Sequence, residues 1–258
     1  MANKRLLRYF IQLAYNGTPY HGWQIQPNAL SVQEVLNKQL SILFQQDINV
    51  VGAGRTDTGV HAREMVAHLD LTKPIEDISL ALNRLNKMLG PHIAVYDFWP
   101  VASSAHARFD AISRSYQYHV HQKKDPFLRG QSAYLRYPIY GSKMKAASEL
   151  LMGERDYSAF SKSRTQTHTN ICTITKAYWE HDGHRWVFHI SANRFLRNMV
   201  RAIVGTLLEV GRGRLEPEDV LKIIVGKDRT KAGESVPAEG LFLTKIEYPK
   251  EIFNGRIS

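Results

Sequence analysis

Hydrophobic and polar positions follow two periods along the chain, and each period predicts one kind of secondary structure. In Glu64 to Leu71, the residues Met65, Ala67 and Leu69 recur at every second position, which predicts a half-buried strand. Behind Ser31, apolar residues recur instead at helical spacing, at Val32, Val35, Leu36, Leu40 and Leu43. The S-x-x-E sequence that begins at Ser31 matches a capping box, which marks the start of a helix.

The same patterns extend over the whole chain and give its order of elements. The first part has expected strands at residues 9–15, 48–52, 64–71 and 92–98, with helices after Ser31 and Asp77. The second part has expected strands at 115–121, 171–180, 185–191 and 241–248, with helices at 142–152, 194–209 and 217–225. Both parts resemble a split β-α-β unit, so we expect an α+β fold of two ferredoxin-like halves, residues 1–105 and 106–258. We expect the halves to join into one mainly antiparallel sheet, with helices on one side and a central cleft.

Composition narrows the classes of protein that this chain can belong to. It has 258 residues, of which 43% are hydrophobic, and no run of eighteen apolar residues that would span a membrane. Arg8 and Gln12 interrupt the apolar part of the N-terminus, so we expect no secretory signal. Cys172 is the single cysteine, which excludes an internal disulfide and makes the cytoplasm the expected location.

The net charge of +10 changes this picture most. Phosphate contacts in proteins come from lysine and arginine, so such a surplus suits a polyanionic partner such as a nucleic acid. The alternative is a basic but otherwise ordinary soluble protein. The histidines show no metal-binding spacing, and we expect neither a metal nor a cofactor.

The stretch from Gly52 to His61 (GAGRTDTGVH) is the first candidate for chemistry. It fits a tight connection between two strands, with glycines and Asp57 as turn-forming residues. It does not match a dinucleotide or phosphate loop, and its Asp-Thr-Gly triplet is weak support for an aspartic protease, which needs two such carboxylates. Alternatively, an ionised Asp57 acts as a nucleophile or stabilises a cationic sugar carbon, with Arg55 nearby to favour its charged form.

Two further stretches carry candidate residues. In the strand around Arg114 to Tyr118 (RSYQY), Tyr116 and Tyr118 share one face, either as core residues or as a surface on which a nucleobase stacks. In the predicted helix at 194–209, Arg194, Arg197 and Arg201 share one face. This face is either simply solvated, or it holds Arg201 partly buried one turn before Gly205, where another backbone can approach.

Five ordered stretches together resemble the tRNA pseudouridine synthase A family over essentially the whole chain. The resemblance rests on Tyr15 to Gly17 with Tyr20 to Pro27, Gly54 to Ala62 (GRTDTGVHA), Arg108-Phe109 with Arg114 to Tyr118, Phe195 to Gly211, and Ala232 to Leu241. Against the family pattern, Thr58 stands where alanine is common, Ser235-Val236 varies the usual Thr-Ala, and Cys172 stands where many relatives carry an arginine.

The resemblance implies a role for each candidate residue. Asp57 matches the nucleophile, Tyr116 the tyrosine that stacks on the target base, and Arg201 the arginine that pairs with the aspartate. Arg55 matches an arginine thought to help draw the base out of its stem. The resemblance further implies isomerisation of uridines 38, 39 and 40 in the tRNA anticodon arm, by a homodimer without metal or cofactor whose joint basic surface holds the tRNA. We expect the central cleft of the fold to bind RNA.

Two matters stay open at this point. The sequence does not decide whether Asp57 attacks C1′ of the sugar or C6 of the base, or assists elimination to a glycal. An RNA-binding protein of the same fold without turnover is the alternative function, and an aspartic protease is a more distant one.

Overall fold

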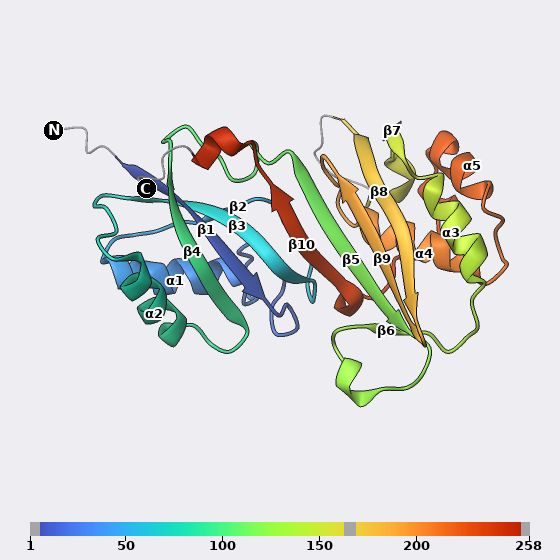
Figure 1. The fold of residues 1–258 in the computed structure, drawn as a ribbon, viewed down its shortest axis with the longest axis horizontal. Helices are drawn as coiled ribbons and strands as arrows, with labels where there is room; N and C mark the ends of the chain where they lie inside the picture. The colour runs from blue at the N-terminus through green and yellow to red at the C-terminus, as the bar shows by residue number, and fades with distance from the viewer. Residues whose placement is uncertain (1–5, 163–168, 254–258) are drawn as a thin grey trace. The chain divides into compact units, whose positions relative to one another are not determined.

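The computed structural model describes residues 6–162 and 169–253, and within them the chain forms an α+β fold with mainly antiparallel strands (Figure 1). The α+β class predicted from the sequence is therefore confirmed. The chain divides into two compact units. The first contains the residues up to Ile112 and those from Leu243 onward, and the second contains Ser113 to Phe242.

The first unit is a sheet with strand order β4-β1-β3-β10, and β2 pairs with β3. Its strands are β1 (Leu7–Tyr15), β2 (Val51–Gly52), β3 (His61–Leu71), β4 (Ile93–Val101) and β10 (Leu241–Glu247), the last of which begins at the boundary of the unit. Its helices are α1 (Val32–Phe44) and α2 (Ile78–Met88). Phe44 of α1 packs edge-on against Phe98 of β4, so the helix covers one face of this sheet.

Both helices of the first unit begin where the sequence predicts. The Ser31 side chain accepts a hydrogen bond from the Glu34 N–H at 3.2 Å, and Asp77 accepts one from the Leu80 N–H at 2.8 Å. Each cap satisfies a backbone donor that the first helical turn leaves without a partner.

Strand β3 is buried on both faces, and the expectation of a half-buried strand was wrong. Val66 and His68 are buried as well as Met65, Ala67 and Leu69. The covering of the second face comes from the segment after β4, where the Ala107 N–H donates to His68 Nδ1 at 3.1 Å. The sequence pattern predicted that this face is exposed because a histidine and an aspartate, His68 and Asp70, lie on it.

The last strand joins the first unit through residues far away in the sequence. The Ile246 N–H donates to the Glu64 carboxylate at 2.8 Å, and the Ile112 N–H donates to the Glu247 carbonyl at 2.8 Å. The compact units therefore divide the chain at Ile112, seven residues beyond the expected division at residue 105, and they group residues from Leu243 onward with the N-terminal part.

The second unit is a sheet with strand order β5-β9-β8-β7, and the short β6 pairs in parallel with β5. Its strands are β5 (Ser113–His121), β6 (Ala133–Tyr134), β7 (Gly153–Asp156), β8 (Ile171–Asp182) and β9 (Arg185–Ala192). Its helices are α3 (Gly141–Glu149), α4 (Met199–Gly211) and α5 (Asp219–Gly226).

Helix α4 begins five residues later than predicted. Asn198 adopts a left-handed backbone conformation with φ of 65°, which cannot continue a right-handed helix. Arg194 and Arg197 therefore lie in the loop before α4, and the prediction that they share a helical face with Arg201 was wrong. The spacing of the three arginines carried no information about the conformation of Asn198.

The expected close approach at Gly205 is confirmed. A Cβ at Gly205 would lie 1.7 Å from the Glu234 carbonyl oxygen, so another side chain there would collide with backbone. Helix α4 consequently packs directly against residues 233–236, and this contact fixes the surroundings of Arg201.

No helix within the described ranges is long and apolar enough to cross a membrane.

His68 is an ionisable group within the first unit, only 5% exposed. Burial, followed by the nearby charges of Arg8 and His106, lowers its pKa to about 4, although Asp70 and Asp110 act in the opposite direction. The imidazole is therefore neutral at neutral pH, and Nδ1 is free of a proton and able to accept the Ala107 N–H.

This burial predicts a loss of stability in mild acid. An unfolded histidine has its pKa near 6.5 and takes up a proton between pH 7.5 and pH 5, whereas folded His68 does not until about pH 4. Acidification over that range should therefore lower the free energy of unfolding by about 2 kcal/mol through His68. Urea denaturation at the two pH values measures this, with His68→Asn as the control that lacks the titrating group. Equal losses in both proteins would contradict the assignment.

Candidate active site

Arg55 and Asp57 lie on the loop that connects β2 to β3 in the first unit. The Val60 N–H donates to the Asp57 carbonyl at 3.1 Å, and Gly59 has φ of +77°, so the chain turns directly after the aspartate. Asp57 is half-buried and Arg55 is exposed. The turn that the sequence predicted therefore exists, and it carries both candidate residues of the first unit.

A second loop, residues 16–23 after β1, holds this turn through backbone contacts. The Trp23 N–H donates to the Thr56 carbonyl at 3.2 Å, and the Gly59 N–H donates to the Tyr20 carbonyl at 3.3 Å. The Tyr15 hydroxyl also lies 2.8 Å from the Thr56 hydroxyl. The residues on both sides of Asp57 are thus fixed by hydrogen bonds.

Gly22 makes this close approach possible. Its φ is +89°, and a Cβ there would lie 2.4 Å from the Thr56 carbonyl oxygen. A side chain would therefore both strain the backbone and push the loop away from Trp23. Gly22 and Trp23 are visible in the sequence as a Gly-Trp pair. Nothing in the sequence showed that this pair would contact the loop of Asp57, because the two segments are far apart along the chain.

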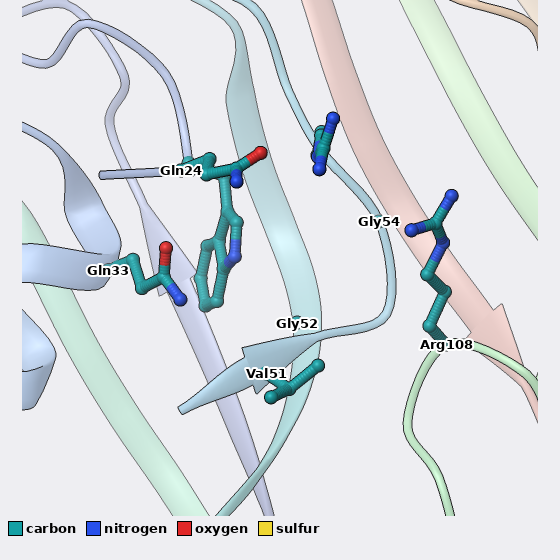
Figure 2. A pocket seen from close by; sticks show the side chains of 8 residues that line it. Gln24, Gln33, Val51, Gly52, Gly54 and Arg108 are labelled. Atoms are coloured by element: carbon teal, nitrogen blue, oxygen red, sulfur yellow. The ribbon is translucent and has the colours of Figure 1, made fainter. Parts of the chain in front are cut away.

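A pocket opens beside the loop, and five side chains with polar or aromatic groups line it (Figure 2). They are Trp23, Gln24, Gln33, Arg55 and Arg108. In Figure 2 the two glutamines lie on one side of the pocket and Arg108 on the other, beyond Gly54. Two guanidinium groups beside the aspartate loop make the pocket suited to an anion such as a phosphate.

Gln33 is a rigid part of this pocket. Its amide nitrogen donates to the Val50 carbonyl at 2.8 Å, and its amide oxygen accepts from the Ile25 N–H at 3.0 Å. The helix α1 residue therefore ties the loop before β2 to the loop after Trp23. Gln33 and Arg108 were not singled out by their residue type in the sequence, although Arg108 falls in one of the five resembling stretches.

The two tyrosines of β5 in the second unit have different environments. Tyr118 is fully buried, and its hydroxyl donates to the Pro237 carbonyl at 2.8 Å. Burial holds the pKa of Tyr118 well above its usual range. Tyr116 is only partly buried, and its ring meets that of Phe195 at 5.1 Å and 86°. Tyr118 is thus a core residue, whereas Tyr116 keeps a partly accessible ring.

Arg201 lies in the first turns of α4 and is held against residues 233–237. Its Nε donates to the Val236 carbonyl at 2.7 Å, and the Val236 N–H donates to the Arg201 carbonyl at 3.2 Å. Because Tyr118 holds the next carbonyl, at Pro237, the helix and β5 both fix this segment. The guanidinium is therefore oriented by backbone, which suits a residue that positions a charge.

Cys172 points into the core of the second unit. It is fully buried, and burial raises the pKa of its thiol to about 11. The thiol is consequently protonated and unreactive at neutral pH.

Among the residues that the structure describes, no group of three or more histidine, cysteine, aspartate or glutamate side chains could hold a metal ion.

The candidate residues fall into two pairs. Arg55 and Asp57 share one loop of the first unit, and Tyr116 and Arg201 lie in the second unit. In each pair one residue, Asp57 or Arg201, lies in a backbone setting fixed by hydrogen bonds, while its companion is accessible.

Comparison with known proteins connects these features to one family. A family model described as tRNA pseudouridine synthase matches residues 147–249. The chain is 52% identical to the tRNA pseudouridine synthase A of Bacteroides thetaiotaomicron over 254 residues, 96% of this chain and 93% of that protein. The chain belongs to the tRNA pseudouridine synthase A family. The protein of that name from Porphyromonas gingivalis is 49% identical over 96% of this chain and 100% of its own length.

More distant members of the family also match at nearly full length. The tRNA pseudouridine synthase A of Exiguobacterium sibiricum is 37% identical over 243 residues, 94% of this chain and 97% of that protein. Both units of the chain are therefore part of the family likeness, including the loop of Asp57 and the helix of Arg201.

The contact at Gly22 generates a prediction. Gly22→Ala should lower the melting temperature by several degrees, since overpacking costs about 1–3 kcal/mol and the positive φ adds strain. Differential scanning fluorimetry measures the shift, and hydrogen exchange at the Trp23 N–H should become faster. Gly54→Ala is the matched control on the facing loop, because a Cβ there meets nothing within 4 Å. Equal melting temperatures for the two variants would show that the loops do not depend on the close approach.

Proposed function

We propose that this chain isomerises uridine to pseudouridine at positions 38, 39 and 40 of the tRNA anticodon arm. The chain is 52% and 49% identical to two tRNA pseudouridine synthase A proteins over 96% of its length, and this similarity carries the proposal. Membership of the family makes the chain an isomerase that acts on uridine in tRNA, and the three positions follow from the family resemblance. The net charge of +10 agrees with a tRNA partner.

In the proposed reaction Asp57 is the nucleophile. The bond from C1′ of the ribose to N1 of the base breaks, the base turns, and a bond from C1′ to C5 forms. The hydrogen at C5 leaves to solvent, and N1 gains one. The atoms balance without any oxidant, reductant or added group. Hydrogen bonds on both sides of Asp57 support this role, because a nucleophile must be held in position against the reacting carbon.

The remaining candidates serve binding and charge in this proposal. Tyr116 stacks on the extruded base, which offsets part of the few kcal/mol that extrusion from a stem costs. Arg201 pairs with Asp57 as its counter-charge, and the fixed orientation of Arg201 on Val236 supports that role. Arg55, exposed beside the aspartate, helps to draw the base from the stem.

We further propose that the protein acts in the cytoplasm as a homodimer whose joint basic surface holds the tRNA. The family resemblance supports the dimer, and the basic composition supports a surface that binds RNA. The isomerisation involves no net oxidation or reduction and no added group, so the proposal assigns no cofactor or metal.

The experiment that tests this function uses a tRNA transcript with tritium at C5 of its uridines. Isomerisation releases that tritium to water, and variants of the transcript with single uridines at 38, 39 or 40 identify the positions. Release from each position supports the proposal. Tight binding of tRNA without release would favour the alternative, an RNA-binding protein without turnover.

Asp57→Asn should abolish tritium release, because the amide cannot act as the nucleophile. The dissociation constant for tRNA should stay within a few fold of the original, since the proposal assigns Asp57 to chemistry and not to affinity. Filter binding measures the affinity in parallel with release. Substantial turnover by Asp57→Asn would remove Asp57 from its assigned role.

Tyr116→Phe should keep most of the activity, because phenylalanine preserves an aromatic ring of the same size. Tyr116→Ala should lose stacking worth roughly 1–3 kcal/mol, so kcat/KM should fall about five- to 150-fold. Single-turnover rates of tritium release compare the two variants. A loss in Tyr116→Phe as large as that in Tyr116→Ala would show that the hydroxyl, and not the ring face, carries the effect.

A further inference from the structure

Arg108 shares the pocket beside the candidate catalytic loop with Arg55, although the two arginines come from different segments of the first unit. Arg108 belongs to the connector that follows β4, whereas Arg55 precedes Asp57 in the loop after β2. Figure 2 shows the Arg108 side chain rising from this connector beside the stretch that contains Gly54. The place of this guanidinium therefore depends on how the connector is held.

Two side chains from the sheet and one just after β10 hold the connector by its backbone immediately before Arg108. Arg8 of β1 donates to the Ala105 carbonyl at 2.9 Å, and the Ala107 N–H donates to Nδ1 of His68 in β3 at 3.1 Å. The Tyr248 hydroxyl, just after β10, donates to the Ala107 carbonyl at 2.5 Å. Ala105 and Ala107 are themselves buried, and the contact between the Ala107 N–H and His68 lies in the interior, away from competing water.

The anchors are themselves fixed. Arg8 forms two hydrogen bonds of 2.8 Å with the Asp70 carboxylate, which sets the direction of its third contact. His68 is neutral, so it can accept at Nδ1, and the Ala107 N–H points to a single acceptor within the protein interior. Removing the acceptor would leave that N–H buried without its partner and would release the connector next to Arg108.

We propose that Arg108 binds a tRNA phosphate beside the target uridine, and that His68 is the positioning residue that sets Arg108 in place through the Ala107 N–H. The proposal rests on the proposed function for the identity of the RNA, and it adds a phosphate subsite formed by Arg108 with Arg55. Phosphate recognition depends on where a guanidinium is held, because its donors form a rigid fork. A histidine with no contact to substrate thereby controls affinity.

The test compares four variants: His68→Leu, His68→Asn, Arg108→Gln and the double variant His68→Leu with Arg108→Gln. His68→Asn is the matched control, because the asparagine Oδ1 occupies the place of the histidine Nδ1 and still accepts a hydrogen bond. Tritium release gives kcat and KM, and filter binding at several salt concentrations gives the dissociation constant and its salt dependence. Melting temperatures report whether each variant folds.

Arg108→Gln should weaken tRNA binding and raise KM, with kcat little changed, and should lower the slope of log K against log salt by about one. His68→Leu should reproduce this pattern in part, and His68→Asn should restore most of the affinity. The double variant should bind no more weakly than Arg108→Gln alone, because both changes remove the same contact.

Three results would each overturn the inference. These are an unchanged salt slope in Arg108→Gln, losses of affinity that add fully in the double variant, or a His68→Asn variant that is as impaired as His68→Leu. If His68→Leu does not fold, Tyr248→Phe replaces it, since it removes the hydroxyl from the Ala107 carbonyl and should give the same rise in KM. Binding alone decides the inference even if wild-type protein releases no tritium, and that second result would count against the proposed function only.

Discussion

Backbone hydrogen bonds between residues 16–23 and the loop around Asp57 fix the backbone on both sides of that residue, and the pocket lined by Trp23 and Arg55 depends on this contact. The Thr56 and Tyr20 carbonyls each accept an N–H from the opposite loop, and Gly22 leaves room for them to meet. In the role proposed for Asp57, a nucleophile displaced by about 1 Å can lose about a hundredfold in rate, so a backbone-fixed loop suits the proposal. Gly22 permits the close approach, and the neighbouring Trp23 lines the pocket beside the loop, so the two adjacent residues contribute to the same site.

The same device appears in the second unit with different elements. Gly205 of α4 permits the backbone at Glu234 to approach, and Arg201 and Tyr118 then take neighbouring carbonyls of that segment, at Val236 and Pro237. In both units a glycine allows two backbones to meet beside a candidate residue, Asp57 in the first unit and Arg201 in the second. Backbone contacts are less sensitive to side-chain motion than contacts between long side chains, which keeps the candidate residues in place.

Periodicity and capping predicted most elements of the fold, because those signals are local. The Ser31 and Asp77 caps and the long strands follow directly from neighbouring residues. The failures depended on contacts that are distant in sequence or on single backbone angles. Burial of both faces of β3 required the connector at Ala107, and the late start of α4 required a left-handed Asn198. For the site, residue type alone left Asp57 and Tyr116 ambiguous, and the family resemblance supplied their roles. Gln33 and Arg108 line the pocket because the folded chain brings distant segments together, and patterns between neighbouring residues could not predict that.

The first unit is assembled from two pieces of chain that the ribosome makes far apart in time. The Glu64 carboxylate of β3 can accept the Ile246 N–H only after Ile246, which follows it by 182 residues, has been synthesised. The hydrogen bond from the Tyr248 hydroxyl to the Ala107 carbonyl of the connector also forms only then. Until those residues emerge, β3 has an open edge, and the connector next to Arg108 lacks one of its anchors. The Tyr248 anchor of the connector is therefore added only after the second unit has been synthesised, although all residues that line the pocket precede that unit.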